Sequence, residues 1–307
     1  MVIHDRSYSR WKGDKTAPVR ATAIIVRAGL RRGIATLFRR KFPAIVLILG
    51  AFGPFVFALG FLFVRHYILN NVDAFPPEIV EGLRSRELTE MTSANGENVY
   101  GYMFIVQWPF VLLACVLLGA GLVAEDRRAN ALELYLSRPM SLREYLVGRF
   151  GTIATFIAAV TVIPAAVLVL VQLSLNWSLE GEAGRLSGLL LRTLLSGALW
   201  VAVPSLLILA TSSLCERARN AAILFLGIIV LLEFVASNIL VEVFGNASFY
   251  LLQIGFNCRQ VGAWILDDPA DLLAAVPVWQ SAVVLAGWIA GCVTIMWRRV
   301  RPVEIVA

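Results

Sequence analysis

The sequence predicts an all-α, polytopic membrane protein with six transmembrane helices. Of its 307 residues, 59% are hydrophobic and only 16% are charged, whereas a soluble domain has about 25% charged residues. Apolar runs of roughly 20 residues recur along the chain, and a helix of that length crosses a hydrocarbon core about 30 Å thick. The six predicted spans comprise residues 42–64, 103–124, 151–175, 193–213, 220–241 and 278–297.

Positively charged residues lie mainly on one side of the predicted membrane. Of the 27 Lys and Arg residues, 21 lie in the two termini and in segments 125–149 and 214–219. Because Lys and Arg stay on the cytoplasmic side, we expect both termini in the cytoplasm and loops 65–102 and 242–278 outside. The expected location is the plasma (inner) membrane. The net charge of +6 then belongs to the membrane surface, and we expect no nucleic-acid partner.

The N-terminal region carries a second membrane-related pattern. Residues 1–41 are expected to form a cytoplasmic basic tail and an amphipathic helix, ahead of the six-span domain 42–297 and a cytoplasmic tail 298–307. A basic helix with one apolar face lies at an anionic membrane surface, so membrane lipids are an expected partner. Packing against another protein is the alternative. The predicted apolar face comprises Val26, Leu30, Ile34 and Leu37, and the opposite face comprises Arg32, Thr36 and Arg39.

Prolines and one long connection interrupt the apolar pattern. Gly53-Pro54 predicts an interruption of the first span, and Pro164 predicts a kink in the third, because proline has no helical N–H to donate. Loop 242–278 contains an apolar stretch that is too short to span a membrane. Within that loop, Asp268-Pro269 is typical of a helix start. We therefore expect this loop to form short helices that dip into the outer membrane surface.

The charged stretch from residue 122 to residue 150 lies between the second and third spans. Good helix formers run from Ala129 to Leu136, and Pro139 ends that helix because the residue before a proline favours extended geometry. Ser141 and Glu144 then form a capping box that starts the next helix. The predicted element is a helix, an elbow and a second helix, which could convert a push from the cytoplasm into movement of both spans. A plain polar hairpin is the alternative.

The motifs of this stretch resemble those of a known family. They are Glu125-Asp126-Arg127-Arg128, Ala131-Leu132-Glu133, Leu136-Ser137-Arg138-Pro139, and Arg143-Glu144-Tyr145 with Gly148-Arg149. This pattern resembles the permease subunits of type-2 ATP-binding-cassette (ABC) exporters, and is similar to the copper-enzyme-maturation permease branch. Asn130 departs from the family, which often has Gly there. The resemblance implies that 125–149 is a coupling helix segment, which docks on an ATPase subunit.

The resemblance also implies partners. It implies a complex of two permeases, as a homodimer or pseudo-dimer, with two ABC ATP-binding subunits. The sequence contains no phosphate-binding motif G-x-x-x-x-G-K-[ST], so we expect ATP and Mg²⁺ to be used by the partner and no cofactor to be bound by this chain. The implied ATPase contacts are Glu125, Asp126, Arg127, Arg128, Leu132, Glu133, Leu136, Arg138 and Pro139.

An acidic residue, Glu233, lies in the middle of the fifth span. An ionisable side chain at that depth usually faces a protein interior or an aqueous cavity. Ser237 lies one turn further on, and Asn238 is close to the same face. These three residues could belong to a translocation path, with Glu233 as a proton-linked group. Alternatively, Glu233 is a neutral, hydrogen-bonded acid at a helix or subunit interface.

Independent enzymatic activity is not expected. The two histidines, His4 and His66, belong to no catalytic motif, and the four cysteines have no metal-ligand spacing. The first functional hypothesis is a non-catalytic permease subunit that exports a lipid, an amphiphile or another small hydrophobic compound. The alternative is an ABC-like membrane module that transmits force to an extracytoplasmic partner, for example in metalloenzyme maturation, or assembles one, without bulk solute transport.

Overall fold

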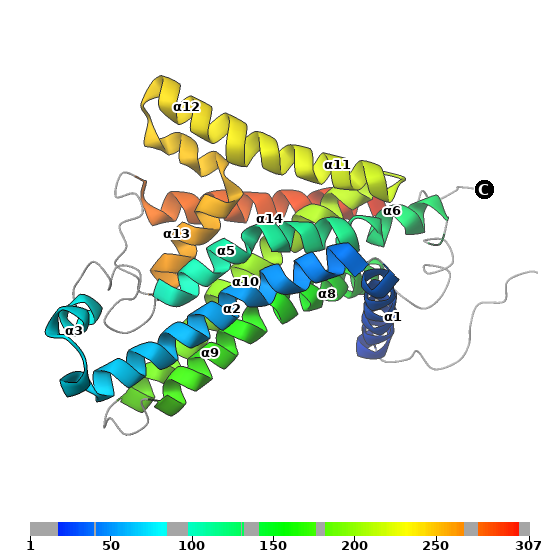
Figure 1. Ribbon diagram of the computed structural model, residues 1–307. Helices are drawn as coiled ribbons and strands as arrows, with labels where there is room; N and C mark the ends of the chain where they lie inside the picture. Colours follow the sequence, from blue (N-terminus) through cyan, green and yellow to red (C-terminus); the bar gives the residue numbers. More distant parts are fainter. Residues whose placement is uncertain are drawn as a thin grey trace, which may run out of the picture.

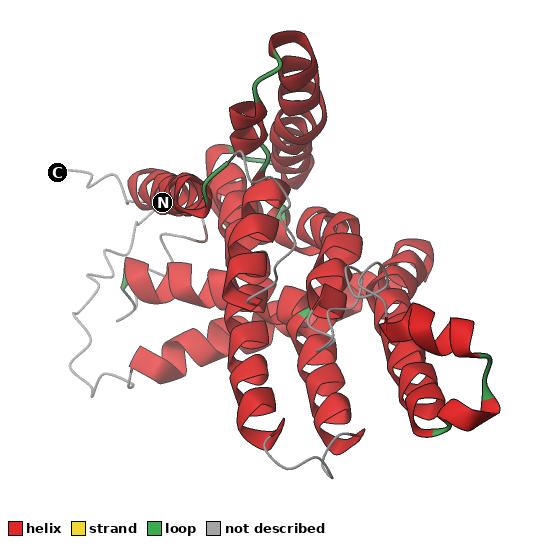
Figure 2. Cartoon of the chain, turned by 90° about the vertical axis from the view of Figure 1, so that its left-hand side faces the viewer, coloured by secondary structure: helices red, strands yellow, loops and turns green. Residues whose placement is uncertain are grey.

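The computed structural model describes residues 18–39, 41–84, 98–129, 131, 141–175, 182–266 and 276–300. The described part of the chain is helical and contains no strand, as Figure 2 shows. Six of its helices are long and apolar enough to cross a membrane, which confirms the predicted fold class and the number of spans. These spans are Lys41–Ile68, Tyr100–Arg128, Leu142–Leu175, Gly188–Leu214, Ala218–Phe244 and Val278–Val300.

The helices extend beyond the predicted apolar runs, because the charged residues at their ends continue the helix past the hydrocarbon boundary. Three spans are single helices and three are composite. The single ones are α2 (Lys41–Asn70), α10 (Glu182–Leu214) and α14 (Val278–Val300). The composite ones are α5 (Asn98–Ala114), π-helix η2 (Cys115–Gly119) and α6 (Gly121–Arg128); α8 (Leu142–Val160) and α9 (Val162–Leu175); and α11 (Ala218–Ile229), π-helix η3 (Val230–Ala236) and α12 (Ser237–Phe244).

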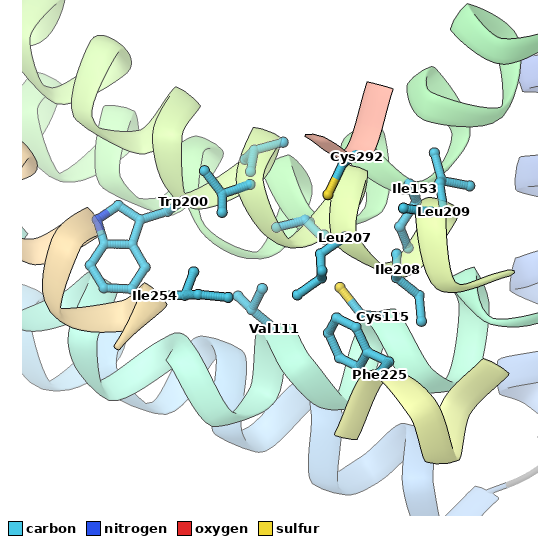
Figure 3. Close-up of a cluster of buried hydrophobic side chains, with 14 of the residues drawn as sticks. Val111, Cys115, Ile153, Trp200, Leu207, Ile208, Leu209, Phe225, Ile254 and Cys292 are labelled. Carbon is cyan, nitrogen blue, oxygen red and sulfur yellow. The ribbon is translucent and has the colours of Figure 1, made fainter. Parts of the chain in front are cut away.

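The central helix is α10, which forms the fourth span. About 67% of its span is buried, compared with 13% for the fifth span and 17% for the sixth. Leu207, Ile208 and Leu209 of α10 pack with side chains of the second, third, fifth and sixth spans in one hydrophobic core (Figure 3). The second, third, fifth and sixth spans are therefore arranged around α10, and the first span, α2, packs on α5 and α9 (Figure 1).

The prolines affect the two spans differently. Helix α2 continues through Pro54, so the interruption predicted at Gly53-Pro54 is wrong. The third span is interrupted at Thr161, three residues before Pro164. Pro164 has no N–H to donate to the carbonyl of Val160, four residues earlier. The side chain of Gln107 on α5 donates to that carbonyl instead, with Nε2 3.1 Å from the oxygen.

The first helix, α1 (Pro18–Arg39), packs on α8 rather than lying apart from the bundle. The contact depends on glycines: a Cβ at Gly29 would lie 2.5 Å from Thr152 Cγ2, and one at Gly148 would lie 2.9 Å from Ile25. The buried line of α1 therefore follows Ile25 and Gly29, next to the predicted apolar face. On the other side of α1, Ile24 and Phe38 remain 66% and 79% exposed.

The opposite end of the bundle contains the shorter elements. After α2 come the 3-10 helix η1 (Val72–Ala74) and α3 (Pro77–Arg84), and after α12 come the 3-10 helix η4 (Ala247–Leu252) and α13 (Ile254–Leu266). Short helices were expected there, but α13 is more deeply placed than predicted. It packs on α10, α14 and α5, and most of its side chains are buried (Figure 1). The helix start predicted at Asp268-Pro269 lies outside the described residues.

Candidate functional site

The two arms of the predicted coupling hairpin meet at the end of the bundle where α1 lies (Figure 1). The first arm ends with α6, whose last turn contains Glu125, Asp126, Arg127 and Arg128. Of these four residues, Glu125 and Arg128 are exposed, Arg127 is half-buried and Asp126 is buried. Leu132, Glu133, Leu136, Arg138 and Pro139 lie outside the described residues, as does the predicted elbow.

The capping box that begins the second arm is confirmed. The hydroxyl Oγ of Ser141 accepts from the backbone N–H of Glu144 at 3.3 Å, and the Glu144 carboxylate accepts from the backbone N–H of Ser141 at 2.7 Å. These bonds satisfy two N–H groups that a helix start leaves without helical acceptors. The start of α8 is therefore fixed by residues close to it in the sequence.

A buried ion pair joins the two arms. The Arg149 guanidinium on α8 donates to Asp126 Oδ2 on α6, and both side chains are about 8% exposed. The Tyr145 hydroxyl, one turn before Arg149, donates to the same oxygen at 2.7 Å. The Arg149 guanidinium also lies 5.4 Å from the centre of the Tyr145 ring. Removing either partner alone would leave a buried charge without its counterion, so single substitutions here are costly.

Ser212 of the central helix α10 forms hydrogen bonds with the backbone of the first arm. Ser212 Oγ accepts from the backbone N–H groups of Val123 and Ala124, at 3.1 and 3.0 Å, and donates to the carbonyl of Ala120 at 2.7 Å. Arg127 donates to the carbonyl of Ser213, close to the C-terminal end of α10. Cations are favoured at a helix C-terminus. The side chain of Arg127 therefore contacts this chain's own α10.

Two weaker contacts link neighbouring helices to this end. Arg32 of α1 lies 3.6 Å from Glu125 in an exposed ion pair, and such a pair contributes about 1 kcal/mol or less. The guanidinium of Arg143 lies 5.5 Å from the ring centre of Trp297 on α14. The arms thus contact α1, α10 and α14 as well as each other.

Glu233 lies in π-helix η3 and contacts the start of α13. Its Oε1 accepts from the backbone N–H of Gly255 at 2.6 Å, and its own carbonyl accepts from Gln253 Nε2 at 3.0 Å. These bonds support the interpretation of Glu233 as a hydrogen-bonded residue at a helix interface. The side chains of Ser237 and Asn238 lie outside the described ones.

Sequence reasoning did not identify Arg149, Tyr145 and Ser212 as members of the site. Arg149 and Tyr145 belong to the motif of the second arm, but Asp126 and Arg149 are 23 positions apart, and no sequence periodicity relates them. Ser212 lies 88 residues from Ala124. One signal for the ion pair was present in the sequence: Asp126 follows the second predicted span and Arg149 precedes the third, and the two residues have opposite charges.

Metal binding receives no support from the described residues. They contain no group of three or more His, Cys, Asp or Glu side chains that could hold a metal ion. Cys115, Cys258 and Cys292 are buried as free thiols, and Cys115 and Cys292 belong to the apolar core (Figure 3).

Six helical spans, with the ends of the second and third joined by polar contacts, define a multi-pass membrane protein. The chain belongs to the ABC-2 family of transporter proteins, whose family model matches residues 24–297. Members of this family generally pair with an ATP-binding subunit and act as its membrane partner. The match is to the family and does not select the copper-enzyme-maturation branch. No curated protein matches the chain.

Proposed function

We propose that the chain is the permease subunit of an ABC exporter, and that a separate ATPase subunit drives it through the hairpin 125–149. The observation that supports this proposal most is the match to the ABC-2 family, which extends over all six spans. In the proposed complex, two permeases pair with two ATPases, and ATP and Mg²⁺ are bound by the ATPases. The membrane would be the plasma (inner) membrane, with both termini cytoplasmic.

The contacts of the hairpin arms support a mechanical role for them. Asp126 and Arg149 join α6 to α8, so a push on the hairpin would move the second and third spans together. Ser212 and Arg127 join the same end to α10, the central helix. Packed interfaces respond to such displacements by switching between discrete arrangements. The free energy of ATP binding could in this way alter the packing of the whole bundle.

The charge distribution of the spans supports a lipid-like or amphiphilic substrate. The six spans have mean hydropathies between 1.7 and 2.6. Inside the fifth span, the carboxylate of Glu233 is engaged with the backbone of α13. A path between such helices suits a compound that is mainly apolar. On α1, exposed Ile24 and Phe38 lie on the same face as Arg27 and Arg31, which suits contact with lipid headgroups.

The test is to purify the tagged chain from its own cells, identify any ABC ATP-binding subunit bound to it, and reconstitute the complex in lipid vesicles. We expect ATP hydrolysis that requires both subunits and drives movement of a labelled lipid or amphiphile across the vesicle membrane. Hydrolysis without such movement would favour the force-transmitting module. Purification without any ATP-binding subunit under mild detergent conditions would contradict the proposal.

Docking on the hairpin can be tested in the same preparation. We expect Leu132→Asp, Arg138→Glu and Arg128→Glu to lower recovery of the ATPase at least about tenfold, because each puts an unpaired or repelled charge at the contact. Charge reversal at Arg127 should do the same while also removing its bond to Ser213. The matched control is Glu78→Lys, a charge reversal on exposed α3 at the other end of the bundle. Wild-type recovery from all four hairpin variants would contradict docking there.

A further inference from the structure

The fifth span lies at the edge of the bundle. Only about 13% of it is buried, close to the 17% and 18% of the sixth and first spans and far below the 67% of the central fourth span. Its first part, α11, packs on α10 and α6, whereas η3 contacts η4 and α13, and α12 contacts η4. Figure 1 shows α11 and α12 along the upper edge of the molecule, joined to the bundle near their two ends. The contacts of η3 with η4 and α13 are therefore important for holding the second half of this span.

The carboxylate of Glu233 lies at the N-terminus of α13. Its Oε1 accepts from the backbone N–H of Gly255, the second residue of that helix. The first N–H groups of a helix have no helical acceptors, and the N-terminus carries a partial positive charge, so a carboxylate is favoured there. A residue of the fifth span therefore does what a capping residue usually does from within the helix's own sequence.

Gly255 allows the carboxylate to approach this closely. A Cβ at this position would lie 3.1 Å from Glu233 Oε2 and 3.1 Å from Trp108 Nε1. Both distances are tighter than ordinary van der Waals contact, so any larger residue would displace one of the two side chains. The start of α13 is thus shaped around the carboxylate.

A second bond has the same direction, with Glu233 again as the acceptor. Gln253, just before α13, donates from Nε2 to the main-chain carbonyl of Glu233 at 3.0 Å. Glu233 lies in the π-helix η3, and single turns of π-helix re-orient side chains and carbonyls relative to an α-helix. The two bonds together fix both the position and the rotation of the α13 start relative to the fifth span.

The middle of α13 is bonded to the sixth span. Gln260 donates to the carbonyl of Val276, which precedes α14, and Ser281 of α14 donates to Gln260 Oε1. Nearer the start of α13, Asn257 donates to the carbonyls of Leu251 and Gln253 at 2.8 and 2.6 Å, which closes the turn between η4 and α13. Helix α13 is therefore connected to the fifth span at its start and to the sixth span at its middle.

We propose that Glu233 is a positioning residue that couples the fifth span to α13, so that displacement of this span moves the buried helix at the end of the bundle opposite α1. Its carboxylate holds the N-terminus of α13, and Gly255 provides the space. The consequence for transport rests on the function proposed above. In that function, a change at the fifth span would reach α13 through this pair of bonds.

Hydrogen–deuterium exchange of the purified full-length chain tests the coupling without a transport assay. In Glu233→Ala, we expect the peptide covering the start of α13 to exchange about tenfold faster, because the acceptor of the Gly255 N–H is lost. Glu233→Gln retains a carbonyl acceptor and should lie within about threefold of the wild type. The matched control, Glu242→Ala, removes an exposed carboxylate from the same span and should have no effect.

Spin labels measure the relative movement directly. Residues 242 and 259 are exposed on α12 and α13, so Glu242→Cys and Arg259→Cys can carry labels in a Cys215→Ser background. We expect a narrow distance distribution with Glu233 present, broadened about twofold by Glu233→Ala and little changed by Glu233→Gln.

Three results would overturn the proposal. One is unchanged exchange and unchanged distances in Glu233→Ala. Another is faster exchange in all spans at once, which would make Glu233 a residue of general fold stability. The third is a distribution that is already broad in the wild type. A chain that fails to transport any solute would leave these measurements valid, so the two proposals fail separately.

Discussion

The two ends of the bundle are held together by different kinds of polar contact. At the α1 end, a buried ion pair between two side chains, Asp126 and Arg149, joins two spans directly, in addition to the bonds of Ser212 and Arg127 to backbone groups. At the α13 end, side chains bond mainly to backbone groups, as Glu233 does with Gly255 and Gln260 with Val276. An ion pair fails when either partner is lost, whereas a backbone acceptor or donor remains and can find a substitute. The α1 end should therefore be the more sensitive to single substitutions.

The largest effect should come from breaking the ion pair. Asp126→Ala leaves the Arg149 guanidinium buried without its carboxylate, and we expect a loss of about 3–5 kcal/mol in unfolding free energy. Thermal unfolding of the purified chain, followed by tryptophan fluorescence, measures it. The double variant Asp126→Leu/Arg149→Met should recover most of the loss, since a buried pair can be replaced by apolar residues. If the single and double variants are equally unstable, the pair does not join the arms.

A substitution at the other end should have a smaller effect. Gly255→Ala places a methyl group between Glu233 and Trp108, and overpacking of this kind costs about 2 kcal/mol. The same unfolding experiment detects the change. Gly287→Ala is the matched control, because a Cβ there would meet no heavy atom within 4 Å among the described residues. Equal stability of the two variants would show that Glu233 and Trp108 can move to accommodate a methyl group at the start of α13.

Two buried serines of α10 differ in their hydrogen bonding, so substituting each with alanine measures what the bonds contribute. Ser212→Ala removes the acceptor of two backbone N–H groups, and we expect a loss of about 1–2 kcal/mol. Within the described structure, Ser205 Oγ is buried without a hydrogen-bond partner, so Ser205→Ala should be neutral or slightly stabilising. We therefore expect Ser212→Ala to melt at a lower temperature than Ser205→Ala. The reverse order would contradict the role given to the Ser212 hydroxyl.

The smallest effect should come from the exposed pair between Arg32 and Glu125. Both side chains are at least half exposed, so Glu125→Gln should change the unfolding free energy by less than about 1 kcal/mol. The difference should also disappear at high salt, because exposed charges are screened. A larger or salt-independent change would mean that α1 is held by charge as well as by its glycine contacts with α8.

The predictions made from the sequence succeeded where the signal was local. Spans follow from apolar runs, the capping box from Ser141 and Glu144, and the break in the third span from Pro164. Predicted span ends were too short, because helices continue through charged residues such as Arg128 beyond the hydrocarbon. Hydropathy could not show that α13 is buried, since its Asn257 and Gln260 resemble loop residues until their partners are known.

Part of the site depended on contacts that sequence spacing does not reveal. Asp126 was expected to contact an ATPase, but in the structure its carboxylate is buried against Arg149 and Tyr145. Glu233 was correctly recognised as unusual because an acid in an apolar run is rare. Its bond to Gly255 joins residues 22 positions apart on two different elements, and only the folded arrangement of α13 shows it.

The break at Thr161 places a joint within the third span. With its 19 residues, α8 is about 28 Å long, so a tilt of about 5° around its hairpin end displaces Thr161 by roughly 2 Å. The bond from Gln107 to the carbonyl of Val160 joins α5 to the last residue of α8. In the function proposed above, a tilt of α8 would therefore reach α5 as well as α9, with an amplitude set by the length of α8.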